Sequence, residues 1–413
     1  MTRSALVATV FSVAVIAAPV LADAPPGTQI KVDPSALAKP GDSPSKANPS
    51  QHVAKPAGAT LSVPPGFSVN VFAEGLSHAR NMVVAANGDV LLVETSAGKV
   101  TLLRDADGDG KAENVSTFVQ GFKSPYGIAL GKDALYVGDL EGAWRIPYTA
   151  GDTTARATPT LVTADGAFGT TGGHSTRNVA LSPDGTKLYA AIGSAGNISE
   201  EPAPRASIQV FTLNGDGTKA GNQRTFASGL RNPVGVGFYP GTKDLYTVVN
   251  ERDTLGDELV PDYLTRVADG GFYGWPYSYI GKNPQPGFAN KRPDLVAKAT
   301  VPDVLFRSHS APIGFAFYTA TQFPKEYRGG AFVALHGSWN ASSPRGYNVA
   351  YVPFDNKKPA GGYTVFASGF WPSNGSTAQV WGRPAGIAVA KDGSLLIADD
   401  SSQTVWRVSY KGN

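Results

Sequence analysis

Four arginines stand at matching places in a pattern that repeats along the chain, each at the turn before an apolar run. They are Arg80, Arg177, Arg231 and Arg383. A guanidinium group donates two parallel hydrogen bonds to a carboxylate, so several of them around one centre would form a strong anion site. This arrangement predicts an acidic ligand or cofactor. The alternative is that each arginine only links neighbouring repeats by hydrogen bonds.

A histidine lies close to one of these arginines, in the segment Gly172-Gly173-His174-Ser175-Thr176. Near neutral pH an imidazole can take the proton of a substrate hydroxyl. If the repeats form a ring, the turn before an inner strand lies at the mouth of the central channel, so His174 is a candidate general base. A surface or hydrogen-bonding role is the alternative. The segment His336-Gly337-Ser338-Trp339-Asn340 is predicted to lie at the same mouth.

Two oxygen-rich segments are candidate calcium sites. The turn Asn250-Glu251-Arg252-Asp253 offers carboxylates and main-chain carbonyls, which are the ligands that Ca²⁺ prefers. A second segment places carboxylates at alternate positions, Asp105, Asp107 and Asp109, as in the first part of a calcium-binding loop. Its twelfth position is Ser116 and not the bidentate glutamate of that pattern. Solvated loop charge for the first segment, and an acidic hairpin turn for the second, are the alternatives.

The elements that must position these residues recur six times. Each copy has a turn with Pro, Asn or Gly, an apolar run, a polar turn and a second apolar run. Residues 81, 125, 178, 232, 312 and 384 mark the copies, and the steps between them are 44, 53, 54, 80 and 72 residues. The first three steps are near the roughly 40 to 50 residues of a four-stranded propeller blade, and the last two indicate long insertions.

The repeat predicts an all-β fold, a six-bladed β-propeller over residues 63–413. A strand near Val69 precedes the first copy and a strand at Val405–Val408 follows the last. Pairing these two strands in the last blade would close the ring and remove an open sheet edge. A two-domain β-sandwich is the alternative.

The N-terminus has the features of a signal peptide over residues 1–24. Arg3 precedes an apolar run of about 16 residues, which is shorter than the ~20 that a membrane-spanning helix needs. We therefore predict an exported protein, periplasmic or secreted, with no membrane span in the mature chain. Residues 25–62 are rich in Pro, Ala and Ser and are predicted to be a flexible leader, partly pinned to the domain.

The composition excludes several classes of function. The chain has no cysteine, which rules out disulfides, cysteine-bound zinc, iron–sulfur clusters and covalently attached c-type haem. A formal net charge of +3 without a basic run argues against nucleic acid as a partner. The absence of a G-x-S-x-G elbow, a P-loop and a Rossmann glycine motif makes serine-hydrolase and nicotinamide chemistry poor fits.

Five motifs in this order resemble a known family. They are the segment from Gly172 to Gly193, Leu230-Arg231-Asn232-Pro233-x-Gly235, Asn250-Glu251-x-Asp253 with Gly256-Asp257-Glu258, Tyr273-Gly274-Trp275-Pro276, and His336-Gly337-Ser338-Trp339-Asn340. Together they resemble the glucose/sorbosone dehydrogenases, in particular the sorbosone and pyranose dehydrogenase branch. Those are soluble pyrroloquinoline quinone enzymes on a six-bladed propeller. The resemblance extends from about residue 63 to residue 410.

The resemblance implies a quinoprotein that oxidises a sugar or sugar aldehyde by hydride transfer to pyrroloquinoline quinone. It implies that His174 is the general base and that Arg231 polarises the quinone and positions the sugar. The turn of Glu251, Arg252 and Asp253 would hold the cofactor calcium, largely through main-chain oxygens. Because no haem motif is present, electrons would pass to a separate acceptor.

The resemblance also implies where the carboxylates of the cofactor are bound. Arg383 matches a cofactor-binding arginine, and Arg80 and Arg177 complete the predicted arginine ring. Where the glucose dehydrogenases have a cofactor-binding lysine in the fifth blade, this chain has the segment of His336 and Asn340. Two other functions remain open: a calcium-dependent lactonase-type hydrolase, and a propeller that binds carbohydrate or protein without catalysis.

Overall fold

The computed structural model describes residues 24–371 and 375–412. The predicted signal peptide, apart from residue 24, lies outside the described residues. Within the described part, no helix has both the length and the apolar character that crossing a membrane requires.

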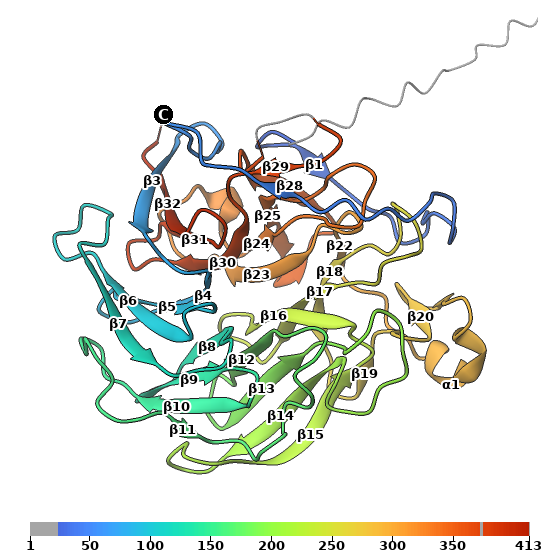
Figure 1. Cartoon of the computed structure of the whole chain (residues 1–413), viewed down its shortest axis with the longest axis horizontal. Helices are drawn as coiled ribbons and strands as arrows, with labels where there is room; N and C mark the ends of the chain where they lie inside the picture. Colours follow the sequence, from blue (N-terminus) through green and yellow to red (C-terminus); the bar gives the residue numbers. More distant parts are fainter. Residues whose placement is uncertain (1–23, 372–374, 413) are drawn as a thin grey trace, which may run out of the picture.

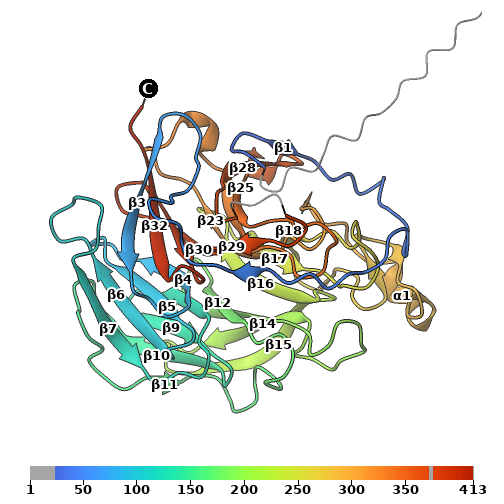
Figure 2. The same cartoon turned by 45° about the horizontal axis from the view of Figure 1, so that its top comes forward.

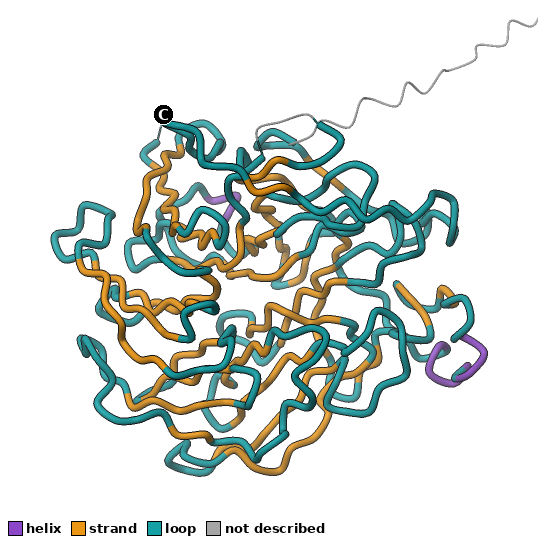
Figure 3. Tube along the Cα trace, in the orientation of Figure 1, coloured by secondary structure: helices purple, strands orange, loops and turns teal. Residues whose placement is uncertain are grey.

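Six antiparallel four-stranded units stand around a common axis in the described residues, as Figure 1 shows. Figure 3 shows that strands and loops make up nearly all of the traced chain. The predicted six-bladed β-propeller is therefore confirmed. The inner strands are β4 (Ala79–Val84), β8 (Gly127–Leu130), β12 (Arg177–Leu181), β16 (Asn232–Phe238), β23 (Pro312–Phe317) and β30 (Pro384–Val389).

The remaining strands of each blade follow outward from the inner one. The second strands are β5 (Val90–Glu94), β9 (Ala134–Gly138), β13 (Lys187–Ile192), β17 (Leu245–Asn250), β24 (Ala331–Leu335) and β31 (Leu395–Asp399). The third strands are β6 (Lys99–Arg104), β10 (Ala143–Pro147), β14 (Ser207–Leu213), β18 (Tyr263–Val267), β25 (Asn348–Val352) and β32 (Thr404–Tyr410). The outer strands are β7 (Asn114–Gln120), β11 (Thr160–Leu161), β15 (Ala220–Ser228), β22 (Val304–Leu305), β28 (Tyr363–Ala367) and β3 (Phe67–Glu74).

Short elements complete the described structure. They are β1 (Gln29–Ile30), β2 (Gln51–His52), β19 (Gly271–Phe272), β20 (Ser278–Tyr279), β21 (Asn283–Pro284), η1 (Ala289–Lys291), α1 (Pro293–Val296), η2 (Lys325–Tyr327), β26 (Phe354–Asp355), β27 (Lys358–Pro359) and β29 (Gln379–Val380). Those from β19 to α1 lie between β18 and β22, where the repeat spacing predicts a long insertion. This insertion is joined to blade three, because β19 pairs in parallel with β15.

The second strands form the packed centre of each blade. Every residue of β5, β9, β24 and β31 is buried, as expected for strands covered on both faces by neighbouring blades. Continuous apolar runs of this kind favour packing between blades over exposure of one face to water. The blades are therefore held in place by side-chain packing and strand pairing, in a chain without cysteine.

The ring is closed as predicted, by a strand from the N-terminal part of the chain. β3 pairs antiparallel with β32, from Phe67 opposite Tyr410 to Glu74 opposite Thr404. The ring of Phe67 makes edge-to-face contacts with four other aromatic rings, at centroid distances of 4.8 to 5.4 Å. Three of these rings, Phe323, Tyr327 and Phe366, belong to blade five. The closing strand thus also connects the last two blades.

Residues 25–62, predicted to be a flexible leader, contact the propeller at several separate points. β1 pairs with β28 and β2 pairs with β29. The side chain of Asn48 donates to the carbonyl oxygens of Ala341 and Ser376, and Lys55 Nζ lies 4.3 Å from the ring centroid of Trp406. Figure 2 shows this blue segment running from β1 toward α1 and back to β3. At these points the leader is pinned to the domain.

Replacing Phe67 by Ala should weaken the closure of the ring. The change removes the ring contacts described above, and we expect the free energy of unfolding to fall by about 3 kcal/mol. Urea denaturation followed by fluorescence measures this change. Val115→Ala is the control, because Val115 is 46% exposed and its truncation should cost less than about 0.5 kcal/mol. Equal shifts in the two variants would show that β3 does not stabilise the closure through Phe67.

Candidate active site

Most of the predicted site residues, but not the loop of Asp105 to Asp109, lie at one end of the ring. The inner and second strands of a blade are antiparallel, and Arg177 pairs with Ile192 as Asn232 pairs with Asn250. Turns before the inner strands and turns after the second strands therefore meet at the same end. His174, Arg231 and the turn after Asn250 come from these positions in blades three and four.

His174 is held as a neutral base with one free ring nitrogen. Its Nδ1 lies 2.8 Å from the carbonyl oxygen of Ser194. A carbonyl oxygen only accepts, so Nδ1 carries the hydrogen and the lone pair stands on Nε2. Burial, together with the charge of Arg231, lowers the pKa of His174 to about 4. The imidazole is therefore unprotonated near neutral pH and can accept a proton at Nε2.

Two buried arginines hold the main chain around this histidine. Arg177 donates to the carbonyl oxygens of His174 (2.7 Å) and Thr170 (2.9 Å). Arg205 donates to the carbonyl oxygens of Thr170 (2.7 Å) and Ser194 (2.6 Å). Burial and the nearby charge of Arg205 lower the pKa of Arg177 to about 10, and its side chain is completely buried.

The cofactor-binding role expected of Arg177 stays a prediction. Each of its described hydrogen bonds is to a carbonyl of the loop that contains His174. We propose that it shapes the loop. Arg205 was missed, because it lies in the irregular connection before β14, where no repeat or motif marks it.

Arg231 is buried beside the base and is tied to the oxygen-rich turn. It donates to the main-chain oxygen of Glu251 at 2.8 Å, and its Nη2 lies 3.3 Å from Asp253 Oδ2. It also contacts the main-chain and side-chain oxygens of Asn197, at 3.2 and 3.0 Å. His309 Nδ1 lies 3.4 Å from the other oxygen of Asp253. The structure thus places His174, Arg231 and Asp253 together, with Asn197 and His309 as neighbours that no sequence motif indicated.

The turn after β17 keeps two of its charged side chains inside the protein. Glu251 and Arg252 form an ion pair at 2.9 Å, with side chains 1% and 0% exposed. The main-chain N–H of Glu251 donates to Asp262, whose pKa burial raises to about 7. The Asp253 carboxylate lies instead between Arg231 and His309. Calcium binding through Glu251, Arg252 and Asp253, mainly by the main chain, stays a prediction.

A second group of charged residues joins blades one, five and six. Asp400 accepts a hydrogen bond from His336 Nε2 at 2.9 Å and lies 2.9 Å from Arg80 Nη2. His78 Nε2 lies 3.2 Å from the same carboxylate oxygen. Burial and the charge of Arg383 lower the pKa of His336 to about 3, so this imidazole is a neutral donor to Asp400. The sequence patterns indicated Arg80 and His336, but they did not indicate Asp400, the carboxylate that contacts both.

Arg383 differs from Arg80 and Arg231 in its partners. It donates to the main-chain oxygens of His336 (2.9 Å) and Gly337 (3.2 Å), and its guanidinium lies 5.7 Å from the ring centroid of Tyr347. Among the described residues it has no carboxylate in ion-pair contact, whereas Arg80 and Arg231 each have one. Its charge therefore remains available to an anionic ligand.

Four other predicted site residues have different surroundings. Asn340 is 5% exposed and its Oδ1 accepts a hydrogen bond from Ser45 of the leader at 2.9 Å. Asp105, Asp107 and Asp109, joined by Glu113, lie in the hairpin between β6 and β7, at the opposite end of the ring. Their oxygens lie within 4.8 Å of one another and accept main-chain N–H groups of the same loop. A structural calcium there stays a prediction.

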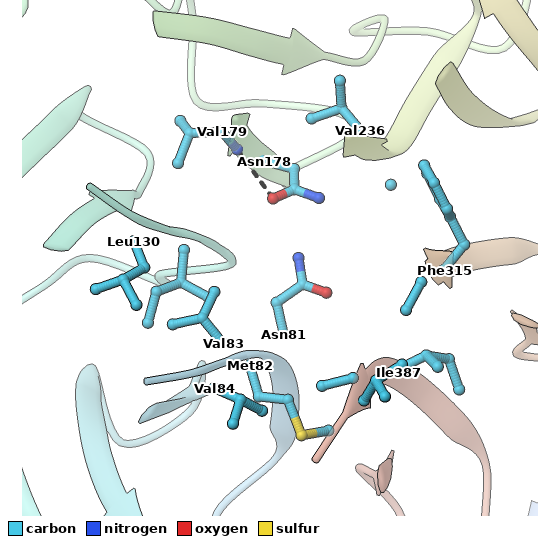
Figure 4. Close-up of a pocket in the computed structure, with 15 residues that line it drawn as sticks. Asn81, Met82, Val83, Val84, Leu130, Asn178, Val179, Val236, Phe315 and Ile387 are labelled. Atoms are coloured by element: carbon cyan, nitrogen blue, oxygen red, sulfur yellow. Dashed lines mark hydrogen bonds between the residues drawn. The ribbon is translucent and has the colours of Figure 1, made fainter. Parts of the chain in front are cut away.

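The channel between the inner strands contains a cavity of about 440 Å³ (Figure 4). Asn81 and Asn178 point toward one another in it, among apolar side chains from several blades. At the end of the channel nearer the candidate site, the Tyr126 hydroxyl donates to the carbonyl oxygen of Ile313 at 2.8 Å. This bond joins blades two and five across the ring.

The close packing beside His174 requires a glycine at position 193. A Cβ atom added at Gly193 would overlap Asn232 Oδ1 and would lie 2.7 Å from His174 Cβ. Asn232 Oδ1 is buried and has no hydrogen-bond partner among the described residues. The space between the histidine and this amide is thus too small for any side chain at position 193.

Comparison with known proteins places this geometry in a family. The family model described as TrAA12-like matches residues 61–262 and 290–411, which is most of the chain and leaves out β18 and the first part of the insertion. The chain belongs to the TrAA12-like family. The family relationship expected from the five motifs is thereby confirmed.

Two curated relatives share sequence with part of this chain. An uncharacterized protein of Borreliella burgdorferi is 36% identical over 242 residues, 58% of this chain and 61% of its own length. A pyrroloquinoline quinone-dependent pyranose dehydrogenase of Coprinopsis cinerea is 27% identical over 415 residues, 84% of this chain and 54% of its own length. The chain therefore spans only about half to three fifths of these relatives.

Solved structures share the fold. The holo form of the pyrroloquinoline quinone domain of pyranose dehydrogenase from Coprinopsis cinerea has a TM-score of 0.71 and 21% identity, over 87% of this chain and 98% of that one. A calcium structure of the Trichoderma reesei family AA12 protein has a TM-score of 0.69 and 19% identity, over 85% of this chain and 97% of that one. Both likenesses bear out the propeller.

His174 should titrate far below an ordinary histidine in the cofactor-free protein. NMR of the ring Cε1 protons resolves each of the five histidines, and the signal missing in His174→Gln assigns this one. We expect a midpoint at about 4, because burial and Arg231 disfavour the imidazolium. A midpoint near 6.5 would contradict the described environment of the base.

Gly193→Ala should impair the site without a defect elsewhere. The new methyl group must displace either His174 or Asn232, and a displacement of about 1 Å near reacting groups costs roughly 100-fold in rate. We expect the His174 signal to shift, and any turnover to fall by about that factor. Gly215→Ala is the matched control, because a Cβ there meets nothing within 4 Å. An unshifted His174 signal in Gly193→Ala would contradict the tight packing.

Proposed function

We propose that this protein is a pyrroloquinoline quinone-dependent oxidoreductase that oxidises a sugar or sugar aldehyde. The observation that supports the proposal most strongly is the state of His174. Its Nδ1–H is fixed on Ser194, its pKa is lowered to about 4, and no described residue makes a hydrogen bond to Nε2. A base of this kind next to Arg231 suits the removal of a proton from a substrate hydroxyl.

The residues at this end of the ring fit a flat anionic cofactor. Pyrroloquinoline quinone carries three carboxylates, and Arg383 keeps a positive charge that no described carboxylate neutralises by ion pairing. Arg80 is the second candidate for carboxylate binding, although it shares Asp400 with His78 and His336. The unpartnered Oδ1 of Asn232 indicates that this amide has a further hydrogen bond to make, with a ligand or water.

The proposed roles follow from these positions. The cofactor supplies the hydride acceptor, and bound calcium would polarise it as a Lewis acid. His174 Nε2 accepts the proton of the substrate hydroxyl, while the carbon that carries this hydroxyl gives up its hydrogen as hydride. Arg231, held between Asn197 and Asp253, presents a fixed positive charge beside the base. It stabilises negative charge that develops on the substrate oxygen and keeps the imidazole unprotonated before the reaction.

Calcium and the cellular context are part of the same proposal. The main-chain oxygens and carboxylate of the turn at Glu251–Asp253 are ligands of the type that Ca²⁺ prefers. The Trichoderma reesei relative has been solved in a calcium form, which is a further reason to include this metal. We propose an exported location, periplasmic or secreted, and a separate electron acceptor, because the chain lacks cysteine for attached haem.

Reconstitution tests the proposal directly. The cofactor-free protein is loaded with calcium and pyrroloquinoline quinone, and dye reduction is assayed with aldoses and sugar aldehydes. We expect turnover in the wild type and a loss of roughly 100-fold or more in His174→Gln, because a general base contributes about 10² to 10⁴ to the rate.

The control for this experiment is His52→Gln in the exposed strand β2 of the leader, which should keep full activity. Absence of dye reduction with every sugar would overturn the proposal. Hydrolysis of a lactone with calcium alone would favour the lactonase-type alternative. Sugar binding that is unchanged in His174→Gln, without turnover in the wild type, would favour a binding propeller.

A further inference from the structure

Asn197 lies where three parts of the candidate site meet. It is half-buried in the loop that follows Ser194, the hydrogen-bond acceptor of His174. Glu201 shapes this loop by accepting the main-chain N–H groups of Ala195 (2.7 Å) and Gly196 (2.8 Å). From this position Asn197 contacts both blade four and the insertion, and it joins blade three to blade four, which no strand pairing connects among the described residues.

Both the oxygen and the nitrogen of the Asn197 side-chain amide form hydrogen bonds with the turn at Asp253. Its Oδ1 accepts from Arg231 Nη2 at 3.0 Å and from the main-chain N–H of Asp253 at 3.0 Å. Its Nδ2 donates to the main-chain oxygen of Asp253 at 3.1 Å and lies 3.4 Å from Thr254 Oγ1. A neutral amide can serve donors and acceptors at once, whereas a carboxylate or an alcohol of this size cannot match this set.

The main-chain oxygen of Asn197 adds two further bonds. It accepts from Arg231 Nε at 3.2 Å and from the indole Nε1 of Trp275 at 2.9 Å. Trp275 belongs to the insertion and is 3% exposed. Two donors on one edge of the Arg231 guanidinium, Nε and Nη2, are thus both bound by Asn197, which itself accepts from a buried tryptophan.

We infer that Asn197 is a positioning residue that sets Arg231 and the oxygen-rich turn at Asp253 in register with the His174 loop. The inference rests on the proposed function, because its effect is exerted on the groups assigned there to the cofactor calcium and the substrate. Hydrogen-bonded partners of metal ligands typically contribute 10- to 100-fold to metal affinity or activity. Loss of the Asn197 side chain should therefore act on calcium binding and on turnover, and not only on stability.

The test compares Asn197→Ala and Asn197→Asp with a matched control. Asn214→Ala removes an exposed asparagine side chain that makes local bonds in the β14–β15 hairpin, at the other end of the ring. Calorimetric titration of the cofactor-free proteins with CaCl₂ measures calcium affinity without turnover. Dye reduction after loading with saturating calcium and pyrroloquinoline quinone then gives kcat and KM for each variant.

We expect Asn197→Ala to weaken calcium binding roughly 10- to 100-fold and to lower kcat by a similar factor. Asn197→Asp keeps the acceptor for Arg231 and for the Asp253 N–H, so its kcat should lie between those of Asn197→Ala and the wild type. This variant also carries the test if Asn197→Ala fails to fold. Asn214→Ala should match the wild type in both measurements.

Two results overturn the inference and are distinguishable. If the wild type binds no calcium and reduces no dye, the proposed function fails and the inference fails with it. If the wild type is active while Asn197→Ala stays within about twofold of it in calcium affinity and kcat, the function stands and the positioning role of Asn197 is wrong.

Discussion

The carbonyl oxygen of Ser194 is the point on which the candidate site depends. It accepts the main-chain N–H of His174 at 3.0 Å, the ring Nδ1–H at 2.8 Å and an Arg205 N–H at 2.6 Å. The main-chain N–H of the same residue donates to the carbonyl oxygen of Arg231 at 2.7 Å. One residue at the end of blade three therefore fixes the tautomer of the base and its distance from the arginine of blade four.

The electrostatics of the site follow from this scaffold. Arg177 and Arg205 satisfy their donors on main-chain oxygens and so add positive charge around His174 without an ion-pair partner among the described residues. Burial, the charge of Arg231 and the charge of Arg205 together lower the pKa of His174 and keep the imidazole neutral. Arg231 and Arg80 are balanced by Asp253 and Asp400, while Arg383 is not. Of these three arginines, Arg383 is the one whose charge no described carboxylate neutralises by ion pairing.

The sequence predicts the framework well because the propeller repeats a local pattern. Apolar runs and turns gave six blades, the closing strand from Phe67 and the insertion after β18, and the same register placed His174 and Arg231 at one end. It did not predict Arg205, Asn197 or Asp400. Their roles depend on contacts made by irregular loops, and such loops produce no periodic pattern in the sequence. Arg177 stands at its expected place in the repeat, and its side chain donates to the carbonyl oxygens of His174 and Thr170, which the sequence did not indicate.

The most direct test of this account is the binding of the cofactor itself. Pyrroloquinoline quinone is titrated into the cofactor-free wild-type protein by calorimetry, with and without calcium, before any sugar is added. The account predicts saturable binding of about one quinone per chain, tighter in the presence of calcium, because oxygen ligands and positive side chains lie at the same end of the ring. Absence of saturable binding under both conditions would contradict it.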